Sequence, residues 1–380
     1  MSEKSVKKIS FLDKMSAKTK HTILRMTVSI LIGLVLAIVL IFIGSERPLT
    51  SIRYLFTAPV SSLPYFSMWI QNSIPLIFTG VAVCVMFSAN QFNLGLEGSF
   101  LMGGFVGGAL ANIYLFKGNV VLGIVGGCII GGLVGAIITL IPALLEKAVG
   151  ASIMVTSLMM NYICLYISQW LLFSYFKDPK TSAGSYYWTD GRTPIFVSTF
   201  GKGSSKLTVY WAVIVAAIIV FVAWLILYKT KLGFKIRLVG QNKNFAKYIG
   251  VSVPTIAILS QVIGGFIGGV GGAAEVLSIF TSYSWQELTG FGWDGVTMAI
   301  FASNNPRSVP IAALFIGYLR TGAYIMSIKT GVQNDLTSVV EGVIILFLLA
   351  ERFLQGTYRK MIIKEAERER DALLASKEAE

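Results

Sequence analysis

Seven long stretches of the sequence carry no charged residue, and they constrain the fold more than any other feature. They run over 26–45, 54–96, 98–116, 118–145, 148–176, 207–228 and 248–274. Each is about as long as, or longer than, the roughly 20 residues that a helix needs to cross a bilayer. Backbone groups in hydrocarbon must bond within the protein, and short strands of alternating polarity are absent from the sequence. The sequence therefore predicts an all-α fold, a polytopic bundle of transmembrane helices.

About ten spans fit the pattern, and they make up a transmembrane domain over 23–350. We expect them at 23–44, 68–88, 98–116, 120–142, 152–175, 208–228, 255–279, 293–303, 309–328 and 336–350. The segment 293–303 has only about 11 residues, so it either crosses the membrane or re-enters it.

The formal charge of +13 is explained by membrane topology rather than by nucleic-acid binding. Excess Lys and Arg near spans mark the cytoplasmic side. The basic N-terminal arm 1–22 and the loop 229–253 are therefore predicted to be cytoplasmic. Ten crossings also return the C-terminus to the cytoplasm, where 351–380 forms a charged, solvated tail. The loop 177–206 then faces outward, as a lid, a docking surface or an interfacial aromatic anchor.

Motifs for an enzyme are missing from the sequence. It has no G-x-x-x-x-G-K-[ST] loop, no nucleophile elbow and no H-E-x-x-H. Cys84, Cys128 and Cys164 lie in apolar runs, where Cys usually behaves as a small hydrophobe, and the one His is His21. We therefore expect no catalytic residue, no metal site, no cofactor and no ATP hydrolysis by this chain.

Glycine runs dominate several of the apolar stretches, around 103–108, 126–135 and 264–272. Glycines four residues apart share one helix face and let neighbouring backbones approach closely. Tight helix packing is the expected result. Two glycine-rich segments in opposite halves of the chain each carry one acid, Glu97 and Glu275. A degenerate internal repeat, as many transporters have, is therefore one interpretation of the sequence.

Polar residues at membrane depth are costly, so they tend to line a cavity, pair with each other or lie at a helix break. The stretch "NQFNLGLEGSF" suggests such a break, with free backbone groups facing a pathway. For every candidate, a structural partner or an interfacial position is an alternative to contact with a solute. The predicted pathway residues are Asn93, Glu97, Asn161, Glu275, Asp294 and Asn304.

A basic segment, "KIRLVGQNKNFAKYIGV" at 235–251, interrupts the apolar sequence. As a helix from Asn242 to Ile249, it places Phe245 and Tyr248 on one side with Ile249, and Lys243 and Lys247 on another. Such a helix offers an apolar knob flanked by positive charge. The alternative is an ordinary positive-inside loop that binds lipid head groups.

Four stretches together resemble one family, the integral-membrane permeases of bacterial ABC importers for simple sugars, nucleosides and branched-chain amino acids. The stretches are "FNLGLEGSFLMGG", "ASIMVTSLMMNYI", "RLVGQNKNFAKYIGV" and "GWDGVTMAIFASNNP", within about 69–350. The extended N-terminus, the large outer loop and the form of the Glu97 segment look most like the larger of two paired nucleoside permeases.

The resemblance implies a multi-pass protein of the bacterial cell membrane that moves a nucleoside or a related simple sugar inward. It implies a second permease subunit, expected to differ from this one, two cytoplasmic ATPases that bind the ATP, and an extracellular solute-binding lipoprotein. Residues 241–249 would then be the coupling helix that docks on an ATPase. This role falls on Gln241, Asn242, Lys243, Asn244, Phe245, Lys247 and Tyr248. The family has Asn-Pro where this chain has Asn242-Lys243, which leaves the start of the helix open.

Two other functions fit the composition. An ion-gradient-driven secondary carrier would use Glu97, Glu275 and Asp294 as coupling groups. A receptor or scaffold is disfavoured by polar residues within glycine-rich spans.

Overall fold

The computed structural model of the chain describes 47–115, 120–177, 210–280 and 282–332, together with 35–36, 38–45, 208, 339 and 342–343. Several predicted segments fall wholly or mostly outside these residues. They are the arm 1–22, most of the span 23–44, the loop 177–206 beyond Lys177, most of the span 336–350 and the tail 351–380.

The chain divides into two compact units, Arg53–Met326 and the combination of Met1–Ile52 with Ser327–Glu380. In the second unit, the Ser51 hydroxyl donates to Thr330 Oγ1 at 3.1 Å. The unit Arg53–Met326 contains every predicted site residue, and the rest of the description concerns this unit.

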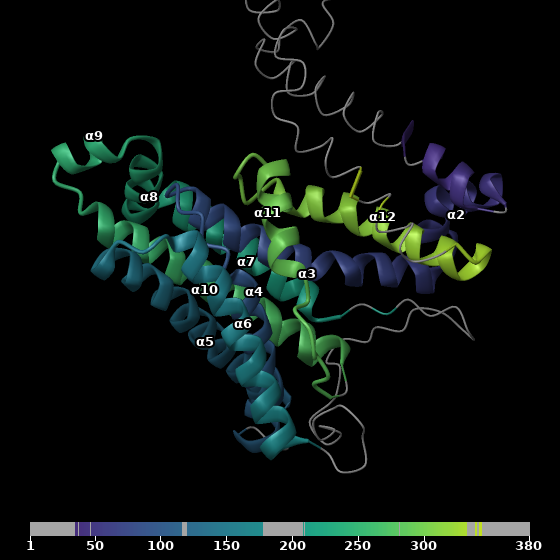
Figure 1. The fold of residues 1–380 in the computed structure, drawn as a ribbon, viewed down its shortest axis with the longest axis horizontal. Helices are drawn as coiled ribbons and strands as arrows, with labels where there is room; N and C mark the ends of the chain where they lie inside the picture. Colours follow the sequence, from purple (N-terminus) through teal and green to yellow (C-terminus); the bar gives the residue numbers. More distant parts are fainter. Residues whose placement is uncertain are drawn as a thin grey trace, which may run out of the picture. The chain divides into compact units, whose positions relative to one another are not determined.

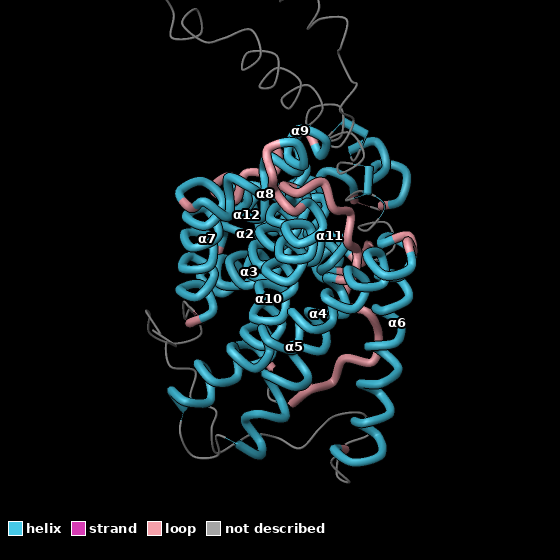
Figure 2. The backbone as a smooth tube through the Cα atoms, turned by 90° about the vertical axis from the view of Figure 1, so that its left-hand side faces the viewer, coloured by secondary structure: helices cyan, strands magenta, loops and turns pink. Residues whose placement is uncertain are grey.

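The described residues form helices joined by loops (Figure 2). In chain order these are α2 (Pro48–Ser61), α3 (Leu63–Phe87), α4 (Leu96–Met102), the π-helix η2 (Gly103–Leu115), α5 (Val120–Val149), α6 (Ile153–Leu171), the short π-helix η3 (Leu172–Phe176), α7 (Ala212–Lys229), α8 (Lys231–Gln241), α9 (Lys243–Tyr248), α10 (Val253–Ile279), α11 (Phe291–Phe301) and α12 (Val309–Thr330).

Six of the described helices are long and apolar enough to cross a membrane. They are α3, α5, α6 with η3, α7, α10 and α12, and each falls on a predicted span. The predicted all-α class is confirmed for the described residues, whereas the count of about ten spans is not confirmed. α5 runs past its predicted end at Pro142, so this proline lies inside the helix.

Two predicted spans take a different form. The span 98–116 is α4 followed directly by η2, which together cover Leu96–Leu115. The short segment 293–303 is α11, with 11 residues. At 1.5 Å per residue α11 is about 16 Å long, too short to cross a hydrocarbon core of about 30 Å. It lies against α3, where a Cβ on Gly295 would come within 2.7 Å of Thr79.

α10 is the central helix of this unit, and it contacts α3, α4, α5 and η2 (Figure 1). Glycine backbones make the closest contacts of α10 with α5 and α4. A Cβ on Gly269 would lie 2.0 Å from the Gly131 carbonyl oxygen, and one on Gly272 would lie 1.8 Å from that of Phe100. Real Cβ atoms do not approach so closely, so these helices pack backbone to backbone. The packing predicted from the glycine runs is confirmed.

Replacing Gly269 by Ala tests this packing. The added methyl group would force α10 away from α5, and overpacking of this kind costs about 1–3 kcal/mol. We expect a lower melting temperature for the purified protein in detergent. Gly342→Ala is the matched control, because a Cβ there meets no atom within 4 Å among the residues that the structure describes. Equal melting temperatures for the two variants would contradict the backbone contact.

Candidate functional site

The helix break predicted from "NQFNLGLEGSF" is present between α3 and α4. α3 ends at Phe87, and 88–95 form turns and extended chain, with Asn90 at a φ of 55°. Buried side chains bind the freed backbone groups. The Leu94 amide donates to Ser157 Oγ at 3.0 Å, and the Leu94 carbonyl accepts from Asn161 Nδ2 at 2.9 Å. Asn161 Oδ1 accepts from the Gly98 amide at 2.9 Å. α6 therefore supports the break.

Asn93 links the break to α10. Its Oδ1 accepts from the Gly95 amide at 2.8 Å, and its Nδ2 donates to Gln261 Oε1 at 2.6 Å. Gln261 is fully buried, and its backbone carbonyl accepts from Thr139 Oγ1 of α5 at 3.0 Å. The sequence analysis missed Gln261. The available signal was an amide side chain inside a glycine-rich span.

The Glu97 carboxylate binds the start of α11. Its Oε1 accepts from Thr289 Oγ1 at 2.8 Å and from the Gly290 amide at 2.7 Å. Its Oε2 accepts from the Gly292 amide at 2.5 Å. A carboxylate is favourable at a helix N-terminus, where amides point outward without partners. Gly290 takes a φ of 80°, which favours glycine, and directs its amide at Glu97.

The other predicted pathway residues make none of the hydrogen bonds described above. Asp294 forms a two-point ion pair with Arg320, at 2.7 and 2.8 Å. Asn304 lies in the loop after α11 at a φ of 56°. Glu275 lies in α10, beside a pocket described below. The structure thus brings together Asn93, Glu97 and Asn161, and their role in a solute pathway stays a prediction.

The basic segment folds as two helices, α8 and α9, which lie at one edge of the unit in both views (Figures 1 and 2). α8 was not anticipated, and Thr230 caps it by accepting from the Gly233 amide at 3.1 Å. The start of α9, left open by the sequence, is Lys243. Asn242 Oδ1 accepts from the Phe245 amide at 3.0 Å, so an Asn cap alone starts this helix without proline.

α9 presents the expected apolar knob. Tyr248 is 90% exposed, Phe245 is 51% exposed and Ile249 is 48% exposed, while Ala246 on the other side is fully buried. Lys243 and Lys247 are exposed as well, so positive charge lies beside the apolar knob, and the docking role of this helix stays a prediction. Large apolar side chains exposed together indicate a surface that another molecule covers.

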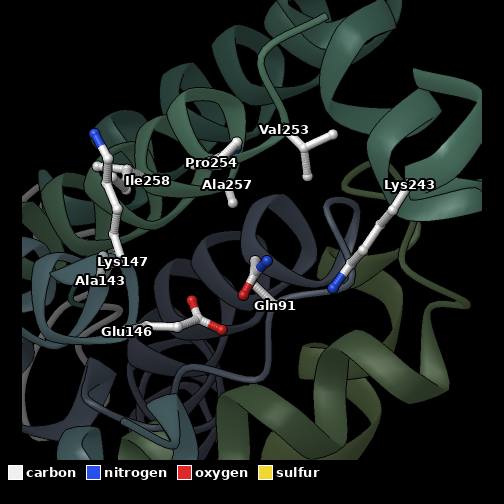
Figure 3. Close-up of a pocket in the computed structure, with 9 residues that line it drawn as sticks. All are labelled: Gln91, Ala143, Glu146, Lys147, Lys243, Val253, Pro254, Ala257 and Ile258. Carbon is white, nitrogen blue, oxygen red and sulfur yellow. The ribbon is translucent and has the colours of Figure 1, made fainter. Parts of the chain in front are cut away.

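A pocket of about 250 Å³ opens beside α9, between the end of α5 and the start of α10 (Figure 3). Gln91 lies at its centre, on the broken segment. The Glu146 carboxylate and the Lys243 ammonium group point toward Gln91, and Lys147 points away. Val253, Pro254 and Ala257 form the apolar wall. Polar groups from the break and from α9 thus share one small space.

Comparison with known proteins identifies the family. Residues 65–349, well over half of the chain, match the family described as branched-chain amino acid transport system, permease component. The chain belongs to this family of ABC importer permeases. The permease is a transport component rather than a catalytic subunit, and this agrees with the absence of an ATPase motif from its sequence.

Three relatives are similar to the chain over most of their length. The guanosine ABC transporter permease NupP of Bacillus subtilis is 26% identical over 88% of the permease and 95% of NupP. The nucleoside permease NupB of Lactococcus lactis is 26% identical, over 90% and 93% of the two chains. The glucose permease TsgB13 of Haloferax volcanii is 25% identical, over 75% and 76%.

The contacts of Glu97 predict that it holds α11 in place. Glu97→Gln keeps the size of the side chain but replaces one acceptor oxygen by an NH2 group that faces the backbone amides. Hydrogen bonds to a charged group contribute about 1.5–3 kcal/mol each, so we expect a clear fall in melting temperature. The Gly290 and Gly292 amides should also exchange hydrogen faster.

Glu146→Gln is the control for this variant, since Glu146 lines the pocket beside α9, away from α11. Unchanged exchange at Gly290 and Gly292 in Glu97→Gln would contradict the anchoring role.

Proposed function

We propose that the permease imports a nucleoside by alternating access, driven by ATPase subunits that bind its α9 helix. Family membership supports import by an ABC system, and the names of NupP and NupB support a nucleoside. The name of TsgB13 keeps a simple sugar as the alternative solute.

The proposed complex has four further parts. A permease of this family works with ATPase subunits and a solute-binding protein. We add a second permease subunit, different from this one, two ATPases on the cytoplasmic side, and a lipoprotein that delivers the solute from outside. The positive charge of the loop 229–253 supports placing α8 and α9 in the cytoplasm, with the N- and C-termini on the same side.

The exposed apolar face of α9 is the observation that carries this proposal. Side chains of high exposure on a short, capped helix suit insertion into a groove of a partner. Lys243 and Lys247 add positive charge, which steers association with an acidic rim. Ala246 packs against the rest of the unit and is buried. A force that a partner exerts on Phe245 or Tyr248 would therefore move the helix and the residues packed against it.

The structure offers a route from α9 to the broken segment. α8 contacts both α9 and α10. Gly240 of α8 lies directly against the residue that follows α3, because a Cβ there would be 2.1 Å from the Ser88 carbonyl oxygen. A displacement of α9 and α8 therefore acts on the first residue of the break. From there it reaches Asn93 and its contact with Gln261.

The ion-gradient carrier is less well supported. Of its three coupling groups, Asp294 is paired with Arg320 and Glu97 is bound by amides and a hydroxyl. Family membership also favours ATP as the energy source.

Replacing both Phe245 and Tyr248 by Ala should abolish most of the transport. Aromatic anchors at the centre of an interface commonly contribute about 2 kcal/mol or more each, so ATPase recovery on purification should fall at least tenfold. Binding of the solute-binding lipoprotein should be unchanged, because it docks on the opposite side of the membrane.

The comparison variant replaces Lys243 and Lys247 by Gln. Exposed charges are screened by salt, so this variant should lose less transport than the aromatic variant. The difference in transport between the Lys variant and the parent should disappear at higher ionic strength. Normal uptake and ATPase recovery for the Phe245, Tyr248 variant would remove the coupling role of α9. If the Lys changes had the larger effect and weakened the attachment of the loop to the membrane, the alternative of a loop that binds lipid head groups would be favoured.

Reconstitution in liposomes tests the energy source and the solute. With ATPase subunits, lipoprotein and internal ATP, we expect guanosine to accumulate, and glucose and leucine to accumulate much less. Uptake by the permease alone under a proton or sodium gradient would establish the secondary carrier instead. Import of glucose or leucine with no import of guanosine would overturn the choice of solute.

A further inference from the structure

A second pocket lies at the end of α10 farthest from α9. It has a volume of about 480 Å³ and is lined by the end of α10, the loop after it and the first residue of α11. Its lining residues are Glu275, Phe280, Ser284, Trp285, Gln286, Glu287, Leu288, Thr289 and Phe291. Glu275 stands 22 residues after Val253, which places it about 33 Å along the helix axis. Small-molecule sites commonly measure roughly 300–1,000 Å³, so the volume suits a small solute.

Glu275 gives this pocket a buried acceptor. The residue is 6% exposed, and its Oε2 is buried and accepts no hydrogen bond from any residue that the structure describes. A buried carboxyl oxygen without a partner is costly and requires an explanation. A ligand that brings a hydrogen-bond donor into the pocket would satisfy it.

Trp285 gives the pocket an aromatic wall. Its ring stacks on Phe100 with 5.7 Å between centroids and a 22° tilt, and Phe280 meets it edge-on at 5.8 Å. A Cβ on Gly104 would lie 2.7 Å from the Trp285 ring, so this glycine makes room for the indole. Tyr283 also meets the ring, at 5.5 Å between centroids, so the indole is held in a fixed orientation. The ring is only partly buried and lines the pocket, where it can stack with a flat ligand.

The remaining lining groups indicate which net charge a ligand of this pocket can have. Ser284 and Thr289 offer hydroxyl groups, and Glu287 adds a second carboxylate. No Lys or Arg occurs among the lining residues that the structure describes. An anionic solute would be repelled here. A neutral solute with a flat ring and with O–H and N–H donors suits the pocket, because the donors can bind the carboxyl groups and the ring can stack on Trp285.

We infer that this pocket receives the nucleoside, with the base stacked against Trp285 and a donor of the base or the ribose bound to Glu275. The inference rests on the proposed function and assigns a place and residues to the solute. Glu275 is one of the predicted pathway residues, whereas Asn93 and Glu97 do not line this pocket and hydrogen-bond to other groups of the protein.

The pocket is joined to the anchor of α11. Thr289 and Phe291 line the pocket, and Gly290 between them donates to Glu97. Thr289 also donates to Glu97. Occupation of the pocket therefore acts on residues that fix the start of α11. Glu275 and Trp285 are binding residues in this arrangement, and Glu97 is a positioning residue.

Protection of an introduced cysteine tests the inference directly. Ser284→Cys places a thiol on an exposed lining residue, and the three native cysteines are buried, so a maleimide should label the new site selectively. We expect guanosine to slow this labelling in the complete, nucleotide-free complex. Adding Trp285→Ala should weaken protection at least about fivefold, the least expected for losing one stacked base. Adding Glu275→Gln should also weaken protection, because it replaces one acceptor oxygen by an NH2 group.

Trp293→Ala is the matched control, because Trp293 is exposed on α11 and does not line the pocket. It should retain protection by guanosine. Glu287→Cys provides a second labelling position should the Ser284 variant not assemble. Rates of ATP-driven uptake are measured on the same preparations.

The outcomes separate this inference from the proposed function. Guanosine uptake without any protection at either cysteine would overturn the pocket and leave the proposed function intact. Equal protection by glucose, or protection by sodium ions alone, would overturn the nucleoside assignment. A complex that imports glucose or leucine but no guanosine would overturn the proposed function itself. Protection that survives both Glu275→Gln and Trp285→Ala would overturn the roles of these two residues.

Discussion

Close contact between glycine backbones is the constraint on which this unit depends. Gly269 and Gly272 of α10 stand against carbonyl groups of α5 and α4 with no room for a side chain. In hydrocarbon, helices gain little from burying apolar side chains against each other, so van der Waals contact between backbones becomes the main source of affinity. The break after α3 and the pocket at the end of α10 both adjoin helices that this contact positions.

The buried polar groups follow a second rule, that broken backbone must be bonded inside the protein. Asn93, Ser157 and Asn161 bind the chain between α3 and α4, and Glu97 binds the start of α11. These residues therefore build the fold at the place where a pathway was expected. Glu275 differs from them, since one of its oxygens has no described partner.

The helices of the proposed ATPase contact and the proposed nucleoside pocket lie at opposite ends of α10. α8 and α9, at one end, reach the break through Gly240 and Ser88. The pocket at the other end reaches the start of α11 through Thr289 and Gly290. Both routes end on short segments held by hydrogen bonds rather than on the glycine-packed helices. Movement of these segments, with the packed helices as a frame, is a physical basis for alternating access.

The all-α class, the positions of the six long helices and the glycine packing could be predicted from the sequence alone. These depend on local composition and on helical periodicity, which a single chain displays. The partners of the polar residues could be identified only from the folded chain. The bonds from Glu97 to Gly292, from Asn93 to Gln261 and from Asp294 to Arg320 join segments far apart in sequence. No residue spacing in the sequence predicts these bonds, because a buried donor can hydrogen-bond to any acceptor that the packing brings within about 3 Å.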